Sequence, residues 1–339
     1  MTTSAVRSTD ASRAYEQHVR DREPAHRVQH TKRGELKAVR GVTLSIAKGE
    51  SVGIVGESGS GKTVMSRASM GLLRGRRVKR DGSVRLNGVE LLTMTSKEIR
   101  ELWGKQIAMV FQDPMTALNP VRRVGPQMAE ALVKRMGMTK EAANARVLEL
   151  LALVRLPEPD KQVVKYPHQL SGGMRQRVMI AMAIACEPEI LFADEPTTAL
   201  DVTVQAQVLE LMGELRQRLG MAMVIITHDL GVVATHTDKI AVMYGGEVVE
   251  IAPTKELFAN MRHPYTEALM KSIPRLDRAP GERMPAIAGT PPDPVAERVG
   301  CAFAARCAYA TDKCHKEHPE LTDAGNGHAY RCFFPLGGK

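Results

Sequence analysis

The sequence of 339 residues lacks any long hydrophobic run. Its longest mainly apolar stretch, residues 178–186, is far shorter than the roughly 18 residues that a membrane-spanning helix needs. The opening residues, MTTSAVRSTDASRAYEQ, contain no apolar core of the kind that a secretory signal carries. We therefore expect no segment that crosses a membrane by itself and no secretory leader. The protein is expected to stay in the cytosol and to reach a membrane only through another subunit.

Internal repeats and a disordered composition are also missing. With 43% hydrophobic and 25% charged residues, the chain is close to the average for globular proteins. Its length allows one large domain with an appendage, or two domains. Residues 1–33 are polar and have neither a helical nor a strand period. We expect them to be poorly ordered, with one short strand or helix at most.

Negative charge is in deficit, because 38 Asp and Glu stand against 47 Lys and Arg, which gives a net charge of +9. Such an excess suits nucleic acid, anionic lipid or nucleotide as a partner. The basic residues are concentrated in residues 1–40 and 74–80. We interpret both segments mainly as solvated surface.

Short apolar strands alternate with helical stretches, and the pattern predicts an α/β fold with a parallel βαβ crossover. A block without strand signal, residues 126–155, predicts two helices inserted into this domain. Asn87-Gly88 follows a strand and predicts a tight hairpin turn. The other expected strands are residues 38–46, 51–55, 83–86, 106–111, 190–194, 222–227, 239–243 and 247–251, and the other expected helices are residues 62–73 and 202–219.

The strongest local motif is GESGSGKT at residues 56–63, which fits G-x-x-x-x-G-K-[ST] between an apolar strand and a helix. Its glycines let backbone N–H groups point at phosphate oxygens, and the helix N-terminus adds positive potential. Lys62 is expected to contact the β and γ phosphates, and Thr63 to ligate Mg²⁺. The expected phosphate-binding residues are Gly56, Ser58, Gly59, Ser60, Gly61, Lys62 and Thr63.

A second motif is the apolar strand ILFADE at residues 190–195, which ends in two carboxylates. Burying two acids is costly unless a cation or a water requires them. We expect Asp194 to hold the Mg²⁺ shell and Glu195 to act as general base toward the attacking water. His228, which follows another apolar strand, is a candidate contact to the γ-phosphate.

A third motif, LSGGMRQR at residues 170–177, predicts an anion site with no local ligand, made of a Ser hydroxyl, glycine N–H groups and a helix N-terminus. With the phosphate loop, it resembles the ATP-binding-cassette (ABC) family of transport ATPases. In that family the Ser-Gly-Gly segment faces ATP bound to the opposite subunit. The resemblance therefore implies that Ser171, Gly172 and Gly173 complete a partner's site.

The resemblance covers about residues 35–272 and implies further roles. Gln112 matches the Q-loop glutamine, another Mg²⁺ contact; Ala199-Leu200-Asp201 matches the D-loop, and His228 the switch histidine. It implies a P-loop NTPase fold with a RecA-like core, an antiparallel β-subdomain and a helical subdomain over about 113–186. The expected division is a tail of residues 1–33, an ATPase domain of residues 34–272 and a C-terminal extension of residues 273–339.

Two segments, residues 111–120 and 194–207, resemble the oligopeptide and dipeptide importers within this family, and His263-Pro264-Tyr265 resembles the start of their C-terminal extension. This implies a subunit that lies at the cytoplasmic face of the membrane and hydrolyses ATP to drive the uptake of peptides. The implied partners are two permease subunits, a substrate-binding protein and a second ATPase, either paralogous or a second copy. Importers of nickel or glutathione are the alternatives.

One departure from the family concerns adenine. The family usually places an aromatic residue about 25 positions before the phosphate loop, but residues 26–33 contain none. His30 and Tyr15 are the available substitutes. The expected consequence is weak selectivity for the base, with phosphate binding unaffected.

Four of the five cysteines fall in the last forty residues, and Cys186 is interpreted as a core residue. Their spacing fits neither C-x-x-C zinc sites nor a standard ferredoxin run. Four thiols in a segment too short for its own core nevertheless indicate a cross-link, and a reducing cytosol disfavours disulfides. The family resemblance implies a [4Fe-4S] cluster; zinc, assisted by His315, His318 or His328, and unligated or disulfide-bonded cysteines are the alternatives. The expected ligands are Cys301, Cys307, Cys314 and Cys332.

A DNA-repair or chromosome ATPase is the rival from another class, because such proteins combine the same motifs and the charge suits DNA. Those proteins place a very long coiled coil between the motifs. Here only 58 residues, 113–170, separate Gln112 from Ser171. We therefore expect no nucleic-acid partner. A translation-factor protein of this family would need two cassettes, and the chain has one.

Overall fold

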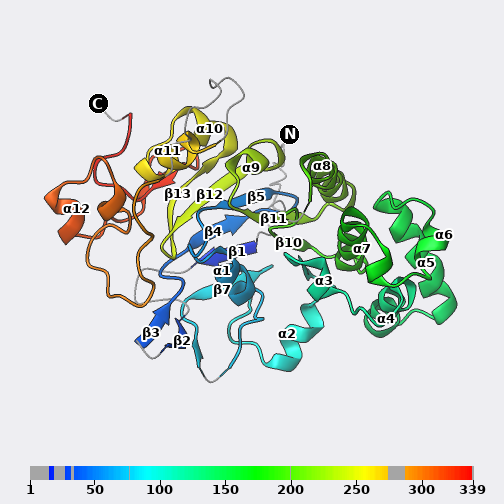
Figure 1. Cartoon of the computed structure of the whole chain (residues 1–339). Coiled ribbons are helices and arrows are strands. Elements are labelled where there is room, and N and C mark those ends of the chain that lie inside the picture. Colours follow the sequence, from blue (N-terminus) through cyan, green and yellow to red (C-terminus); the bar gives the residue numbers. More distant parts are fainter. Residues whose placement is uncertain are drawn as a thin grey trace, which may run out of the picture.

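The computed structural model describes residues 15–18, 27–31, 34–75, 77–198, 200–273 and 287–337. Its centre is an eight-stranded mixed sheet with helices packed on both faces (Figure 1). Five neighbouring strands are parallel, and the remaining three continue one edge as antiparallel pairs. Across the sheet the order is β14 (Thr322–Asp323), β15 (Ala329–Tyr330), β13 (Glu247–Pro253), β12 (Lys239–Tyr244), β5 (Ser51–Val55), β11 (Ala222–Thr227), β10 (Ile190–Asp194) and β9 (Ile107–Val110).

The central strands β5, β10 and β11 are buried along their whole length, as parallel strands covered on both faces are. On one face α1 (Lys62–Ser69) and antiparallel strands form a core around Met65 and Val84. On the other face α7 (Gly172–Ile184), α8 (Val202–Leu219) and α9 (Leu230–His236) form a second core. The strand and crossover-helix predictions for residues 190–227 are confirmed.

Two smaller antiparallel sheets lie beside the central one. They include β1 (Tyr15–His18) and β2 (Arg27–Thr31), so the described part of residues 1–33 contains two strands where the sequence predicted one element at most. The predicted hairpin at Asn87-Gly88 is confirmed, with φ angles of 51° and 81°. The remaining strands are β4 (Thr43–Ile46), β7 (Ser83–Leu86) and β8 (Val89–Glu90) in one sheet, and β3 (Gly34–Lys37) and β6 (Val78–Lys79) in the other.

The predicted strand over residues 38–46 is wrong in extent. Only its last four residues form β4, and β3 ends before it begins. Gly41 interrupts the run, because it has a φ of 148° and bridges to Glu247 on the central sheet. The segment therefore passes from one sheet to another instead of continuing in one.

A helical lobe lies to one side of the sheet, on the right in Figure 1. It contains the two helices predicted within residues 126–155, which are confirmed as α4 (Val124–Met136) and α5 (Lys140–Leu153). Gly137, in the left-handed conformation, ends α4, and the Thr139 side chain caps α5. The other helices before α7 are α2 (Ser96–Leu102), α3 (Pro114–Ala117), α6 (Pro159–Gln162) and the 3₁₀ helix η1 (Pro167–Gln169).

The C-terminal segment, defined here as residues 287–337, lies at the opposite side of the sheet (Figure 1). The sequence predicted an appendage with little regular structure, but β15 pairs with β13 and so extends the central sheet. A two-residue strand is too short to leave a periodic signal. The predicted domain boundary near residue 273 adjoins residues 274–286, which are outside the described part. The neighbouring helices are α10 (Thr254–Ala259), α11 (Pro264–Lys271), η2 (Ala304–Arg306) and α12 (Asp312–Lys316).

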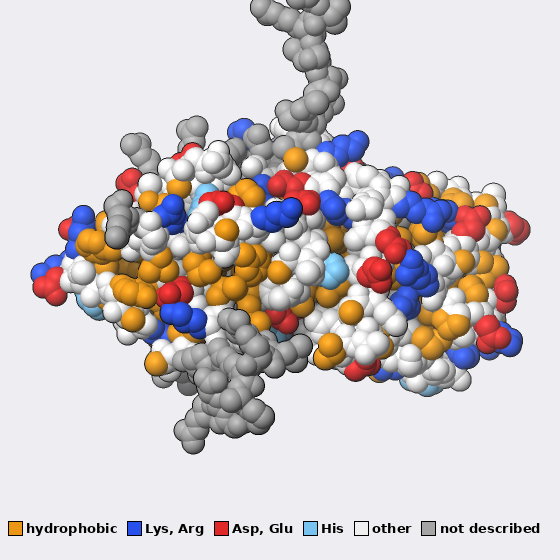
Figure 2. Space-filling model, turned by 90° about the horizontal axis from the view of Figure 1, so that it is seen from above, with side chains coloured by type: hydrophobic (Ala, Val, Ile, Leu, Met, Phe, Trp, Pro, Cys, Tyr) orange, Lys and Arg blue, Asp and Glu red, His pale blue; other side chains and the backbone are white. Residues whose placement is uncertain are grey.

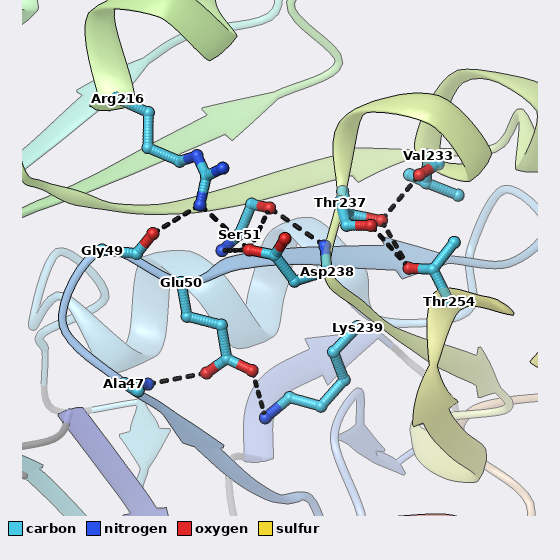
Figure 3. Close-up of polar contacts among 10 residues, drawn as sticks. All are labelled: Ala47, Gly49, Glu50, Ser51, Arg216, Val233, Thr237, Asp238, Lys239 and Thr254. Atoms are coloured by element: carbon cyan, nitrogen blue, oxygen red, sulfur yellow. Dashed lines mark hydrogen bonds and ion pairs between the residues drawn. The ribbon is translucent and has the colours of Figure 1, made fainter. Parts of the chain in front are cut away.

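A polar network joins the amino ends of β5 and β12 to α8 (Figure 3). Asp238 accepts hydrogen bonds from the backbone N–H and the hydroxyl of Ser51, each at 2.8 Å, and from Arg216 at 2.9 Å. Arg216 also donates to the carbonyl of Gly49. The network fixes the relative register of strands that come from distant parts of the chain.

Charged side chains of both signs are scattered over the helical lobe, whereas hydrophobic side chains gather toward the middle and the side of the C-terminal segment (Figure 2). Within the described ranges, no helix combines the length and the apolar character that crossing a membrane requires.

Candidate nucleotide site

The loop of residues 56–63 connects β5 to α1 at the carboxyl end of the sheet. Glycine is required at two of its positions. A Cβ at Gly56 would come within 2.1 Å of the Met243 carbonyl oxygen, and one at Gly61 within 2.4 Å of the Ala38 carbonyl oxygen. Because Gly61 also has a φ of 98°, both space and backbone conformation exclude a side chain.

Lys62 is the first residue of α1, and its side chain turns back into the loop. Its Nζ donates to the carbonyl oxygens of Gly56 at 2.6 Å and Glu57 at 2.9 Å. Burial lowers the pKa of Lys62, and the carboxylates of Glu195, Asp194 and Glu57 oppose this effect. The Lys62 ammonium is therefore held inside the loop by the carbonyl oxygens of Gly56 and Glu57. Of the remaining predicted loop residues, Ser60 is buried, whereas Ser58 and Gly59 are exposed.

Thr63 and Asp194 meet beside this lysine. The Thr63 hydroxyl donates to Asp194 Oδ1 at 2.8 Å, and Arg67 Nη2 lies 3.5 Å from Asp194 Oδ2. Asp194 is fully buried, and burial raises its pKa although Thr63 and Arg67 lower it. A hydroxyl and a carboxylate in contact offer the oxygen ligands that Mg²⁺ prefers, so these residues fit the predicted ion.

Three side chains converge on the carboxylate of Glu195, the residue after β10. Gln112 Nε2 donates to Oε2 at 2.9 Å and the Thr198 hydroxyl to the same oxygen at 2.8 Å, while His228 Nδ1 lies 3.3 Å from Oε1. Partial burial alone would raise the pKa of Glu195, but the bonds from Thr198 and His228 hold it below its usual value. The group is therefore ionised at neutral pH and is able to accept a proton from a water held beside it.

The structure does not bring every predicted residue to this loop. Ser171 caps α7, and its exposed hydroxyl accepts from Met174 of the same helix at 3.3 Å. Asp201 caps α8 in the same way by accepting from Val204 at 3.0 Å. Gly173 packs so closely that a Cβ there would lie 2.8 Å from Val204 Cγ1. Ser171, Gly172 and Gly173 thus form a helix N-terminus in the helical lobe.

Some contacts were missed by the sequence analysis. Thr198 lies inside the motif segment 194–207 but was given no role, and Arg67 lies one helical turn after Thr63. Each lies three or four positions after a motif residue, so a search for polar residues at that spacing would have found both. Ala199 of the predicted D-loop lies outside the described residues. Of the two adenine candidates, Tyr15 begins β1 and His30 lies within β2.

The four C-terminal cysteines line one pocket together with aromatic rings, among them Phe303. Backbone groups two residues further along the chain oppose the effect of burial on the pKa of three of these thiols. Burial raises the pKa of these three thiols, that of Cys332 to about 11, and the other thiols add to the effect. All five cysteines are unbridged, and no three or more His, Cys, Asp or Glu in the described ranges are spaced as ligands of a single metal ion. The pocket cysteines are Cys301, Cys307, Cys314 and Cys332.

A phosphate loop after β5, an acid pair at the carboxyl end of the parallel strand β10 and a Ser-capped Gly-Gly helix together define an ATP-binding cassette. The comparisons agree. Residues 39–198 match the family described as ABC transporter, and residues 249–314 match the oligopeptide/dipeptide transporter C-terminal region. The chain belongs to the ABC transporter family and is an ATPase of that family.

Named relatives cover most of the chain. The dipeptide transport ATP-binding protein DppD of Bacillus subtilis (strain 168) is 49% identical over 88% of this chain and 90% of its own. The oligopeptide transport ATP-binding protein OppD of the same organism is 48% identical, with 87% and 83% covered. Among solved structures, the ATP-binding cassette MJ0796, dimeric and bound to ADP and Pi, is 28% identical with a TM-score of 0.62 over 71% of this chain and 98% of that chain. The predicted nucleotide-binding fold is confirmed.

Proposed function

We propose that this ATPase energises the uptake of dipeptides or oligopeptides across the cytoplasmic membrane. The observation that carries the proposal is the combination of a complete nucleotide site with a C-terminal region of the oligopeptide/dipeptide transporter type at residues 249–314. Relatives about 48% identical over nearly the whole chain are named for dipeptide and oligopeptide transport. Nickel and glutathione are the alternative cargoes.

Within the nucleotide site, Lys62 and the loop N–H groups bind the β and γ phosphates of ATP. Thr63, Asp194 and Gln112 hold Mg²⁺, which supplies charge neutralisation for the phosphates when it is bound. Glu195 accepts the proton of the attacking water, and His228 contacts the γ-phosphate. The contacts of Gln112, Thr198 and His228 with Glu195 support this assignment, because they orient the carboxylate and keep it ionised.

The signature residues act on the ATP of a second subunit. Ser171 caps the exposed N-terminus of α7, and its hydroxyl accepts a hydrogen bond from Met174 of the same helix. We assign this helix N-terminus as an anion site. Asp201 begins the next helix, α8, beside it. We infer a dimer with a paralogous ATPase or with a second copy of this chain. In the assembled complex, Ser171→Arg should abolish hydrolysis at the partner's phosphate loop, whereas full activity of a demonstrably monomeric chain would exclude the shared site.

The remaining proposed partners are two permease subunits, which hold the ATPase at the cytoplasmic face of the membrane, and a substrate-binding protein that delivers cargo. No nucleic-acid partner is proposed. Closure of two subunits on ATP and their reopening after hydrolysis would drive the permeases.

The cargo is tested with proteoliposomes that contain the whole complex and the substrate-binding protein. Four probes are compared: a labelled dipeptide, a labelled tetrapeptide, Ni²⁺ and glutathione. We expect ATP-dependent uptake of a peptide and its loss with Glu195→Gln in this chain. Uptake of Ni²⁺ or glutathione without peptide uptake would replace the cargo and leave the ATPase assignment intact.

We also propose that Cys301, Cys307, Cys314 and Cys332 bind a [4Fe-4S] cluster. Support comes from the one pocket that all four line and from neighbouring backbone groups, which favour the thiolate form of three of the cysteines. Hydrogen bonds from backbone groups stabilise thiolates and are a recognised feature of iron–sulfur sites. When bound, the cluster would add folding free energy to a segment with a small core of its own.

This site is tested on protein purified anaerobically. Brown protein with broad absorption near 400 nm is expected, and Cys314→Ser should bleach it while ATP binding persists. Cys186→Ser is the matched control, because Cys186 is buried elsewhere and should leave the colour unchanged. Stoichiometric zinc, or no metal under strict anaerobiosis, would contradict the cluster.

A further inference from the structure

The phosphate loop is held by the C-terminal segment of its own chain. Glu57, the second residue of the loop, directs its carboxylate at Arg306, which lies 249 positions away in η2. Arg306 Nη1 lies 2.6 Å from Glu57 Oε2 and Nη2 lies 3.0 Å from Oε1. Two parallel charge-assisted bonds of this kind fix both position and orientation of the carboxylate.

Arg306 is itself held rigidly. Its Nε donates to the carbonyl of Ala288 at 2.8 Å and Nη2 to that of Ile287 at 2.9 Å. Nη1 also lies 3.2 Å from the Tyr244 hydroxyl, and the side chain is only 4% exposed. A planar guanidinium with its donors engaged loses little further entropy when it binds a carboxylate. The ion pair therefore transmits the position of the C-terminal segment to the loop.

A second contact acts on the loop backbone. The N–H of Glu57 donates to the Tyr265 hydroxyl at 2.9 Å. Tyr265 is fully buried against Tyr244 and Phe303, with ring centroids 4.5 and 5.2 Å away. The carbonyl of Glu57 in turn accepts from Lys62 at 2.9 Å. Side chain, N–H and carbonyl of one loop residue are thus all fixed.

The charge of Glu57 makes this contact relevant to ATP. An unpaired carboxylate in the phosphate loop repels the phosphates, and a partly buried charge that loses its partner is costly. We propose that Arg306 is a positioning residue for ATP binding: it neutralises Glu57 and holds the phosphate loop in the conformation that places Lys62. The C-terminal segment is then part of the ATP-binding apparatus, whatever the pocket cysteines bind.

The test compares variants for ATP binding and for steady-state hydrolysis in the assembled transporter. Arg306→Ala should raise the Kd and KM for ATP about tenfold, the typical effect of losing a charged hydrogen-bond partner. The kcat should stay within about twofold, because the groups around Glu195 are untouched. Arg306→Lys should recover part of the affinity, since the charge remains and the fork is lost.

The decisive comparison adds Glu57→Gln. If Arg306 acts by neutralising Glu57, the double variant Glu57→Gln with Arg306→Ala should bind ATP better than Arg306→Ala alone. A purely structural role for Arg306 would give the double variant an equal or larger defect, and that result would overturn the proposal. Should Arg306→Ala not fold, Arg306→Lys and Glu57→Gln measure the same coupling.

Arg331→Ala is the matched control. Arg331 belongs to the same segment and is similarly buried, but it donates to the carbonyl oxygens of Val248 in β13 and Pro319 in the segment itself. Its variant should leave the Kd for ATP unchanged. An equal loss of affinity with Arg331→Ala would mean that general loosening of the segment is responsible, and it would refute a specific role of Arg306.

Discussion

Polar and charged side chains gather at both ends of the parallel strands, and they are arranged differently at the two ends. At the amino ends, Ser51, Asp238 and Arg216 bind one another (Figure 3). At the carboxyl ends, Asp194 is the last residue of β10, and Lys62 begins α1 after the loop that follows β5. An aspartate therefore joins two strands and a helix at one edge of the sheet, and another aspartate contacts Thr63 of the phosphate loop at the other edge.

Most polar groups of the amino-end network are paired, although Arg216 Nε is buried without a hydrogen-bond partner among the described residues. Besides the bonds to Asp238, Glu50 accepts from the N–H of Ala47 at 2.7 Å and pairs with Lys239 at 2.8 Å. A ligand would have to compete with partners that are already well placed. The network therefore contributes to stability and to strand register.

The carboxyl ends differ because a helix begins there. The first residues of α1 present unsatisfied N–H groups and the positive end of the helix dipole. Lys62 is bonded only to carbonyl oxygens of its own loop and to Ser60, and burial raises the pKa of Asp194. Phosphates and a cation relieve both conditions. In open α/β sheets, ligands bind at this edge for the same reason.

The largest effect separating the two edges is expected from Glu195→Gln. The substitution keeps the shape of the side chain and removes the proton acceptor, so ATP hydrolysis should fall at least about 10²-fold. Binding of ATP should be preserved, because the phosphate loop is unchanged. Single-turnover hydrolysis and equilibrium binding, measured in a complex whose partner site is also disabled, test this.

Glu189→Gln is the control for that variant, since Glu189 directly precedes β10 at its amino end. It should hydrolyse ATP normally. Near-normal hydrolysis by Glu195→Gln would refute its role as the base, and a large loss with Glu189→Gln would contradict the division between the edges.

Contiguous motifs made the nucleotide site predictable. The loop of residues 56–63 and the strand that leads into Asp194 and Glu195 are local features, because the residues that determine their chemistry are neighbours in the sequence. The pairing of Glu57 with Arg306 is not, because it joins residues 249 positions apart and neither side chain belongs to a periodic pattern. The sequence analysis noted Tyr265 only as part of His263-Pro264-Tyr265. Its hydrogen bond to the phosphate loop could be recognised only from the fold.

Strand extent was less predictable than strand existence. The strands β5, β10 and β11 are buried throughout and mainly apolar, and they were predicted to the residue. In contrast, β15 has two residues and owes its pairing to the backbone of β13. The four cysteines were identified as a group by sequence proximity, whereas their common pocket depends on how η2 and α12 fold back on each other.

The second prediction compares two glycines with positive φ at opposite edges. Gly61→Ala places a Cβ 2.4 Å from the Ala38 carbonyl, whereas Gly49→Ala meets nothing within 4 Å. Both variants pay the roughly 1 kcal/mol of left-handed backbone strain. Only Gly61→Ala should also distort the phosphate loop and weaken ATP binding, by about tenfold or more.

Binding titrations and thermal unfolding of the two variants distinguish these effects. Gly49→Ala should lower the Tm by about 1–2 °C, in line with about 1 kcal/mol in a chain of this length, and bind ATP as the parent does. Equal ATP affinity in both variants would show that the close approach of Gly61 to Ala38 does not shape the site.

The smallest effect is expected from Asp238→Asn, and it depends on pH. Burial opposes ionisation, but hydrogen bonds from Ser51 and Arg216 hold the pKa of Asp238 below its usual value. The folded state therefore binds this proton less readily than the unfolded chain, where an aspartate titrates near about 3.9. Ionised Asp238 stabilises the fold above that pH, and the contribution is lost as the pH falls through the lower folded pKa. Because its side chain is 54% exposed, the effect should be at most about 1 kcal/mol.

Thermal unfolding between pH 7 and pH 3 should show that Asp238→Asn is slightly less stable than the parent at pH 7 and that the difference vanishes in acid. Asp81→Asn, an exposed control, should follow the parent, and neither variant should change hydrolysis at pH 7. A difference that grows in acid would reverse the sign, and a loss of hydrolysis with Asp238→Asn would show that the amino ends of the strands also serve the nucleotide site.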